Sequence, residues 1–332
     1  MKNVAVIGFG FMGLTHTINI LKNKRLQLKA IVDKDPGIIE KKLTEQTGNF
    51  STGCLSEESL EGIRKYASME ECLVMEDIDA CFICVHTGLH FDMTKKALLA
   101  GKHVFLEKPM CLDIRQGEEL IRLANERNLI LMPGQVVRFM PAYLELKRWM
   151  IALEYGPLEF LSLSRFAGIP SWGEWAARQA DFGSSGGALF DLVLHDIDFV
   201  QSILGDPDSI RSEILPGRLS GHDYINAIWK YDNNRITVKV EGGLIFHSTF
   251  PFHAGFSAKF EKASILYHTL QPDHISIATD RGVMQVWAGP ANDGFSGEIE
   301  YFATCIDEGT RPVLCTPESA LQTIRICYDH LK

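Results

Sequence analysis

Asp191 and His195 stand four residues apart in the segment GGALFDLVLHDID, which spans residues 186–198. On a helix this spacing places both side chains on one face, so the carboxylate can orient the imidazole and stabilise its charge. Histidine titrates near neutral pH, and His195 can therefore take a proton from a hydroxyl group while hydride leaves the same carbon, or return it in the reverse reaction. The alternative is a structural His–Asp pair in an apolar helix. Asp198, seven residues after Asp191, falls on the same face and is a candidate to line the pocket. The alternative for both Asp196 and Asp198 is a capping or solvated role.

A second reactive group is the lysine of the tripeptide Glu107-Lys108-Pro109, which follows the apolar run His103–Leu106. Open parallel sheets place ligand-binding groups at such strand ends. Proline restricts the residue before it to extended backbone angles, which fixes the direction of the lysine. We expect Glu107 and Lys108 at a cofactor and Lys108 also at a substrate hydroxyl; a solvated lysine is the alternative.

A glycine-rich turn follows the first apolar run, Val4–Ile7, with the spacing G-x-G-x-x-G. In this motif the first glycine permits a tight turn, the second lets the backbone approach a pyrophosphate, and the third lets the next helix pack closely. The start of that helix attracts anions. We therefore expect a bound dinucleotide, NAD or alternatively NADP. The residues expected at the cofactor from this turn are Gly8, Gly10, Phe11, Met12 and Gly13.

Asp33 ends the second apolar run, Leu28–Val32, about 20 residues past the last glycine. A carboxylate there can accept hydrogen bonds from the adenosine ribose and repel a 2′-phosphate, which favours NAD. Lys34 follows directly and can partner a phosphate, so NADP stays open. The alternative for Asp33 is an ordinary turn residue before Asp35.

Length and composition favour a two-domain globular protein that handles small molecules. The chain has 332 residues, 46% of them hydrophobic, and a formal net charge of −9. It has no basic stripe for nucleic acid or an anionic membrane, no apolar run near the ~18 residues of a membrane span, and no signal segment. We therefore expect a cytoplasmic location, with neither nucleic acid nor membrane as a partner.

The cysteine pattern indicates reduced thiols and no metal. The chain has 8 scattered cysteines, which do not form a disulfide framework. Cys81 and Cys84 form a C-x-x-C pair, but it lies inside the apolar run Ala80–Val85, where residues three apart point to opposite faces of a strand. Two such sulfurs cannot share an ion, so no zinc site is predicted.

Strand-like and helix-like runs alternate over the first part of the chain, which is the pattern of a doubly wound parallel sheet. The second part contains longer β-rich runs that suggest an open-faced, mostly antiparallel sheet. The fold class is thus α/β plus α+β, with a Rossmann domain over residues 1–130 and a substrate-binding and oligomerisation domain over residues 131–332. Expected helices cover 12–21, 91–100, 114–127 with Asp113 as N-cap, 142–153, 187–204, 297–306 and 317–331.

These motifs together resemble the glucose-fructose oxidoreductase / inositol dehydrogenase (Gfo/Idh/MocA) family over nearly the whole chain. The resemblance depends on the N-terminal GFGFMG, on the segment from Ala100 to Pro109, and on GGALFDLVLHDID. It implies a dehydrogenase that transfers hydride between NAD(P) and a sugar, inositol or related polyol. It also implies that Lys108, Asp191 and His195 are catalytic, and that the second sheet assembles homodimers or homotetramers.

The sequence departs from the family pattern after the fourth strand. Where similar sequences often have V-P-T-x-x-H, this chain has His86 in place of the proline, followed by Thr87 and His90. We expect this loop beside the cofactor, with all three residues contacting it, although the role of His86 is open. His90 is alternatively a simple helix-start histidine.

Further polar and aromatic residues are candidates for substrate contact in the second domain. Arg138 follows the crossover segment that begins at Gly134, and a structural ion pair is its alternative. Arg165, Trp172 and Trp175 precede the histidine helix, and aromatic faces pack well against sugar rings. A core or oligomer-contact role is the alternative for these three.

Two other classes of protein use the same scaffold. One is an NAD-dependent glycoside hydrolase, which oxidises a sugar transiently and leaves no net NADH. The other is a non-catalytic dinucleotide-binding sensor or regulator, against which the joint presence of Lys108, Asp191 and His195 argues.

Overall fold

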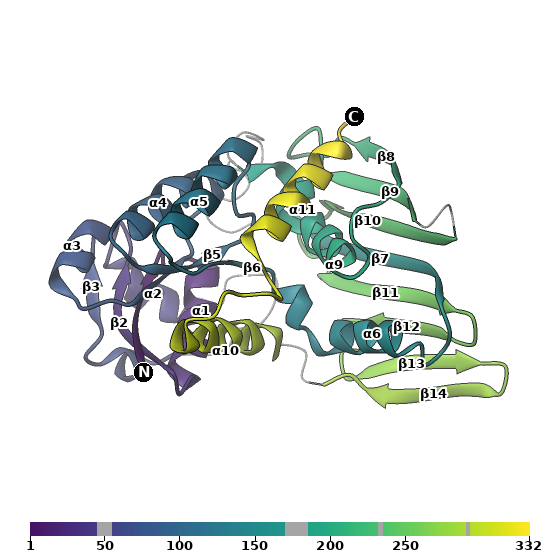
Figure 1. Ribbon diagram of the computed structural model, residues 1–332, viewed down its shortest axis with the longest axis horizontal. Helices are drawn as coiled ribbons and strands as arrows, with labels where there is room; N and C mark the ends of the chain where they lie inside the picture. The colour runs from purple at the N-terminus through teal and green to yellow at the C-terminus, as the bar shows by residue number, and fades with distance from the viewer. Residues whose placement is uncertain (45–54, 170–184, 232–234, 290–292) are drawn as a thin grey trace. The chain divides into compact units, whose positions relative to one another are not determined.

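The computed structural model describes residues 1–44, 55–169, 185–231, 235–289 and 293–332. The chain divides into two compact units (Figure 1). The first unit comprises Met1–Gln135 and Phe295–Leu321, and the second comprises Val136–Gly294 and Gln322–Lys332. The predicted division at residue 130 follows chain order. The structure instead returns a C-terminal segment to the first unit, because that segment completes the first core.

The first unit is built on a parallel sheet of 6 strands in the order β3-β2-β1-β4-β5-β6. This is the classic doubly wound order, and it confirms the predicted Rossmann fold. The strands are β1 (Lys2–Ile7), β2 (Leu26–Val32), β3 (Arg64–Tyr66), β4 (Ala80–Ile83), β5 (His103–Glu107) and β6 (Leu131–Gly134). The helices are α1 (Phe11–Lys22), α2 (Ile38–Thr44), α3 (Met69–Met75), α4 (His90–Leu99), α5 (Ile114–Glu126) and α10 (Asp293–Glu308), with short 3-10 turns η1 (Glu57–Leu60) and η2 (Thr87–Leu89).

Alternate residues of the strands pack on opposite faces of this sheet. On one face Cys81, Ile83 and Leu106 share a core with α5. On the other, Phe82 stacks on Phe105 with ring centroids 5.0 Å apart, and both rings contact side chains of α1 and α10. Because both faces are covered, β4 is buried along its whole length.

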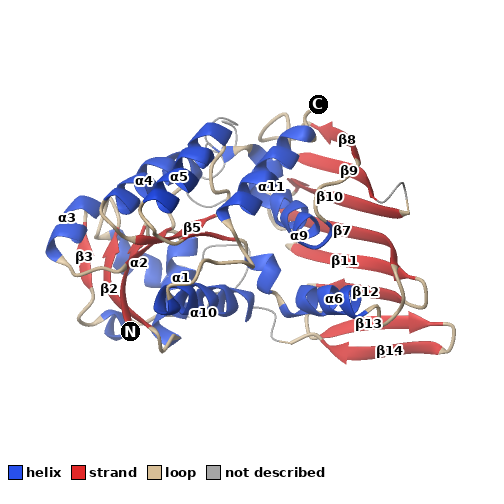
Figure 2. Ribbon diagram, in the orientation of Figure 1, coloured by secondary structure: helices blue, strands red, loops and turns tan. Residues whose placement is uncertain are grey.

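The second unit contains a sheet of 8 strands in the order β14-β13-β12-β11-β7-β10-β9-β8 (Figure 2). All neighbours pair antiparallel except β7 and β10, which are parallel, so the predicted mostly antiparallel sheet is confirmed. The strands are β7 (Leu158–Gly168), β8 (Ser209–Leu215), β9 (Tyr224–Tyr231), β10 (Ile236–Phe246), β11 (His253–Phe260), β12 (Ser264–His268), β13 (His274–Thr279) and β14 (Gly282–Trp287).

Helices of the second unit pack on one face of its sheet. They are η3 (Val136–Phe139), α6 (Pro141–Ala152), the π-helical turn η4 (Leu189–Val193), α9 (Leu194–Leu204) and α11 (Pro317–Asp329), which begins in the first unit. Tyr143 of α6 contacts the rings of Phe199 on α9 and Phe256 on β11. Along β9, buried residues alternate with partly exposed ones, as expected for a strand with one covered face.

Candidate active site

The glycine turn has the three properties that a dinucleotide requires. Gly8 has a φ of 92°, and a Cβ there would lie 2.8 Å from the backbone nitrogen of Val85. A Cβ at Gly10 would meet nothing within 4 Å, whereas one at Gly13 would overlap the carbonyl oxygen of Gly8. The turn is therefore tight at its first glycine, open at its second and closely packed at its third, so these residues fit a pyrophosphate at the start of α1.

The side chains of Asp33 and Lys42 both form hydrogen bonds with the backbone of Phe9, the residue between the first two glycines. Oδ2 of Asp33 accepts a hydrogen bond from the Phe9 N–H at 2.9 Å. The Lys42 ammonium donates to the Phe9 carbonyl oxygen at 2.6 Å. Sequence reasoning missed Lys42, because its partner is a backbone carbonyl 33 residues away. Lys34, by contrast, is exposed.

The loop after β4 is anchored by its last histidine. His90 is buried, and its two ring nitrogens lie 2.7 Å from the Pro109 carbonyl oxygen and 3.0 Å from that of Val85. Burial lowers the pKa of His90 despite these two acceptors. His90 thus connects this loop to the segment after β5. His86 is exposed, and Thr87 is partly exposed. Their cofactor contacts stay predictions.

Lys108 follows β5 and is partly exposed, whereas Glu107 is 5% exposed. Oε2 of Glu107 accepts a hydrogen bond from the Lys108 N–H at 3.1 Å, and its Oε1 is paired with Nε2 of His16. Burial works against the charge of Glu107, but the hydrogen bond with His16 and the charge of Lys108 outweigh it and lower the pKa of Glu107. The Glu107 carboxylate therefore holds the backbone of Lys108 in place by a hydrogen bond at the end of β5.

In the second unit, Asp191 and His195 differ from their neighbours in exposure. Of the described residues 188–200, these two are partly exposed and all others are buried. Asp191 lies in the π-helical turn η4, whereas His195 lies in α9. η4 packs tightly on β10, because a Cβ at Gly242 would lie 2.9 Å from Cγ2 of Val193.

The two candidate arginines both take part in buried ion pairs. Arg138 donates from Nε and Nη2 to Asp198, each at 2.6 Å, and Asp198 also accepts from Thr323 at 3.0 Å. Arg165 donates in the same two-point manner to Asp196 at 3.0 and 2.9 Å. These pairs support the structural alternative for the arginines. Asp196 and Asp198 are buried partners, neither capping nor solvated residues.

The remaining predictions concern two tryptophans, the C-x-x-C cysteine pair and membrane-spanning helices. Trp172 and Trp175 lie outside the described residues. Cys81 and Cys84 are both buried, and burial raises the pKa of the Cys81 thiol to about 12. Among the described residues, no helix combines the length and apolar character needed to cross a membrane.

Family models match both parts of the chain. Residues 2–135 match the model described as oxidoreductase family, NAD-binding Rossmann fold. Residues 143–253 match the GFO/IDH/MocA C-terminal domain.

Several similar proteins with a named activity are dehydrogenases. The chain is 26% identical over 325 residues to a scyllo-inositol 2-dehydrogenase (NAD(+)) of Bacillus subtilis, covering 93% of this chain and 87% of the relative. It is 24% identical over 319 residues to an inositol 2-dehydrogenase of Rhizobium meliloti, covering 92% and 88%. A solved structure of levoglucosan dehydrogenase with NADH and levoglucosan superposes with a TM-score of 0.83 at 18% identity, covering 99% of this chain and 96% of that one.

Proposed function

Because the chain belongs to the Gfo/Idh/MocA family of NAD-binding oxidoreductases, we propose that it transfers hydride between NAD and a CH–OH carbon of a sugar, inositol or related polyol. NADP is the alternative cofactor. The names of the similar proteins support this substrate class, since they act on inositols and on levoglucosan.

The first unit supplies the cofactor site in this proposal. The open backbone at Gly10 and the N–H groups at the start of α1 hold the pyrophosphate, and the carboxylate of Asp33 accepts from the ribose. When bound, the nicotinamide supplies or accepts the hydride. His86, Thr87 and His90 belong to the loop assigned to its nicotinamide end.

Lys108 is assigned to the substrate hydroxyl and the nicotinamide end of the cofactor. Its backbone is held at two points, by the Glu107 carboxylate at its own N–H and by His90 at the carbonyl of the next residue. A held backbone fixes the position from which the lysine side chain reaches the substrate, which favours a reproducible hydrogen-bond geometry.

The observation that carries the proposal is the partial exposure of Asp191 and His195 on an otherwise buried helix. The helical segment over residues 188–200 is buried except at Asp191 and His195, so a substrate can reach these two side chains. The imidazole is the proton acceptor, and the carboxylate is the group proposed to orient it. His195 takes the hydroxyl proton as the alcohol is oxidised and returns it when the ketone is reduced. Asp191 stabilises the imidazolium that forms in between.

The test is a screen for NADH and NADPH formation on inositols, aldoses, aminosugars, sugar nucleotides and glycosides, with aglycone release followed in parallel. Stoichiometric NADH from a polyol or sugar supports the proposal. Glycoside cleavage that requires NAD without net NADH overturns it in favour of the hydrolase. Tight NADH binding with no turnover on any of these compounds overturns it in favour of a sensor.

We further propose that the sheet of the second unit assembles homodimers or homotetramers. Its edge strand β14 presents large apolar side chains to solvent, since Val283 is 71% and Trp287 is 68% exposed. Exposed apolar groups of this size favour a protein contact. Sedimentation analysis of the wild type and of Trp287→Glu tests this, and a monomer at micromolar concentration contradicts it.

A further inference from the structure

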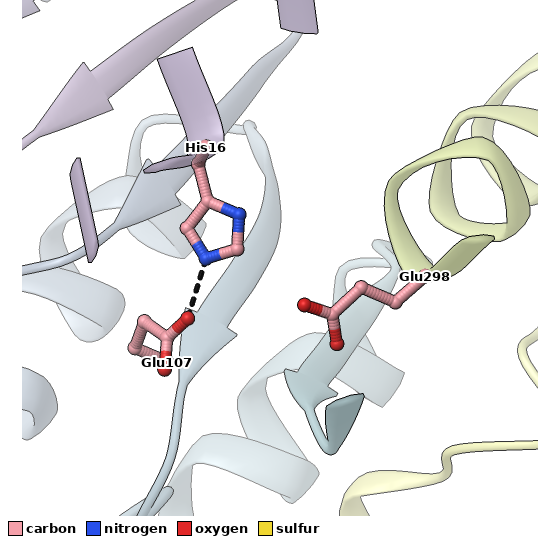
Figure 3. Close-up of side chains that lie close together, drawn as sticks. All are labelled: His16, Glu107 and Glu298. Atoms are coloured by element: carbon pink, nitrogen blue, oxygen red, sulfur yellow. Dashed lines mark hydrogen bonds and ion pairs between the residues drawn. The ribbon is translucent and has the colours of Figure 1, made fainter. Parts of the chain in front are cut away.

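Three buried ionisable side chains meet in the first unit on the α1 and α10 side of the sheet. His16 comes from α1, Glu107 from the end of β5 and Glu298 from α10, and one donor atom of each lies within 4.8 Å of the others. Their exposures are 0%, 5% and 0%. Figure 3 shows the carboxyl group of Glu298 pointing toward the hydrogen-bonded His16–Glu107 pair from the opposite side.

The surroundings of this cluster are aromatic. The ring of His16 lies 5.0 Å from that of Phe105 and 6.2 Å from that of Phe295, in edge-to-face contacts. The rings of Phe82 and Phe302 complete this layer. Such surroundings offer little solvation, so each additional charge in the cluster is costly.

Three polar atoms of this cluster have no hydrogen-bond partner within the described residues. Neither carboxyl oxygen of Glu298 has a hydrogen-bond partner there, and neither does Nδ1 of His16. If Nε2 of His16 carries the hydrogen that Glu107 accepts, then Nδ1 is a free acceptor. Figure 3 shows this nitrogen on the side of the ring that faces Glu298. A protonated Glu298 is the donor that matches it.

The charges around the cluster support a neutral Glu298. Burial, and secondarily the charge of Glu107, raise the pKa of Glu298 well above its ordinary value. The other titratable groups that face the pair are His90, Lys108 and Cys84. Only Lys108 among them is ordinarily cationic, and its N–H and charge act on Glu107.

We propose that Glu298 is a positioning residue, which stays an uncharged carboxylic acid, donates its proton to the His16–Glu107 pair, and so fixes the carboxylate that holds the backbone of Lys108. The same pair fixes α1, the helix that starts at the glycine turn. The cluster therefore joins the pyrophosphate site to the lysine. This inference rests on the role of Lys108 in the proposed function.

A divalent cation is the rival occupant of this cluster. It would need the three ligand atoms at about 2.0–2.2 Å from a common centre. His16 and Glu107 are instead hydrogen-bonded to each other, which leaves no ion position between those two atoms. Metal analysis of the purified protein therefore belongs to the test.

The first experiment detects the protonation state of Glu298 directly and needs no substrate. Infrared difference spectra compare the wild type with E298Q and with E300Q, a matched control because Glu300 is exposed on the same helix. A band of an uncharged carboxylic acid at neutral pH, lost in E298Q and kept in E300Q, is the expected result. The absence of that band, or a stoichiometric metal ion lost in E298Q, overturns the proposal.

The second experiment separates positioning from mere packing. Glutamine keeps the shape and a donor, so NADH affinity of E298Q should stay within about twofold of the wild type. E298A leaves Nδ1 of His16 without a donor, and NADH affinity should fall by about tenfold. With the substrate found by the screen, kcat of E298A should fall while that of E298Q is kept. Equal loss in both variants overturns the positioning role; a silent screen with the infrared band present contradicts only the proposed function.

Discussion

The backbone N–H of Phe9 donates a hydrogen bond to Oδ2 of Asp33 at 2.9 Å, which joins the glycine turn to the end of β2. One carboxylate thus stabilises the turn and stands at the position proposed for the ribose. Removing the whole side chain would disturb both, so the charge has to be tested with the hydrogen-bond acceptor kept in place.

Asp33→Asn should relax discrimination against NADP. The amide oxygen still accepts from Phe9, while the negative charge that repels a 2′-phosphate is gone. We expect the ratio of kcat/KM for NADP to that for NAD to rise by about tenfold. Asp92→Asn, at an exposed position of α4, is the control for a lost surface charge. An unchanged ratio would place the discriminating group elsewhere, and Lys42 is then the next residue to test.

His195→Ala should abolish turnover and leave NADH affinity unchanged. Loss of the group that exchanges the proton lowers kcat by about 10²–10⁴. NADH binding should be spared because His195 is proposed to contact the substrate, whereas the glycine turn is proposed to hold the cofactor. Fluorescence titration with NADH and steady-state kinetics check both parts, with His274→Ala at an exposed position of β13 as control. Wild-type turnover in His195→Ala would refute the assignment.

Arg165 can be tested as a structural residue or as a substrate contact. The charge of Asp196 raises the pKa of the Arg165 guanidinium despite burial, and the two side chains form a two-point hydrogen-bonded pair. Arg165→Met alone leaves a buried carboxylate and should lower the free energy of unfolding by about 3–5 kcal/mol. Adding Asp196→Leu should recover most of that loss.

Urea unfolding measures the stability of both arginine variants. Turnover of the double variant then decides between the two roles. Activity close to the wild type supports a structural Arg165, whereas a stable but inactive double variant supports the predicted substrate contact.

Stability should fall as pH rises above about 4.5 because of Glu298. The folded state holds the Glu298 proton more tightly than the unfolded state, since its pKa is raised in the folded protein. Above the unfolded pKa the folded state therefore binds more protons, and the free energy of unfolding decreases with pH until the folded pKa is passed. E298Q should remove this decline, which urea unfolding at several pH values measures. A decline of the same slope in E298Q would show that another group causes it.

Local sequence signals predicted the elements that depend on local chemistry. The glycine turn was predictable because each of its three glycines meets a separate local requirement: a positive φ, open space and close packing. The helix after Asp113 was equally predictable, and Asp113 caps it by accepting from the Arg115 N–H at 2.7 Å.

Features that depend on distant partners were not predictable. Strands β3, β8, β11 and β13 do not stand out as apolar runs in the sequence, because they are short or contain polar residues, and neighbouring strands supply their hydrogen bonds. The proposed interaction between His16 and Glu298 joins residues from opposite ends of the chain. Its only sequence signal is a glutamate within the apolar stripe that Phe295 and Phe302 form on α10.

The return of Phe295–Leu321 to the first unit bears on the order in which a ribosome completes this protein. Phe302 closes the aromatic layer over β4 and β5, and Leu321 enters the core on the opposite face. Phe302 and Leu321 are synthesised after nearly all residues of the second unit. Nascent chains fold domain by domain from the N-terminus where they can. The core of the first unit is therefore completed only after Phe295–Leu321 have been synthesised.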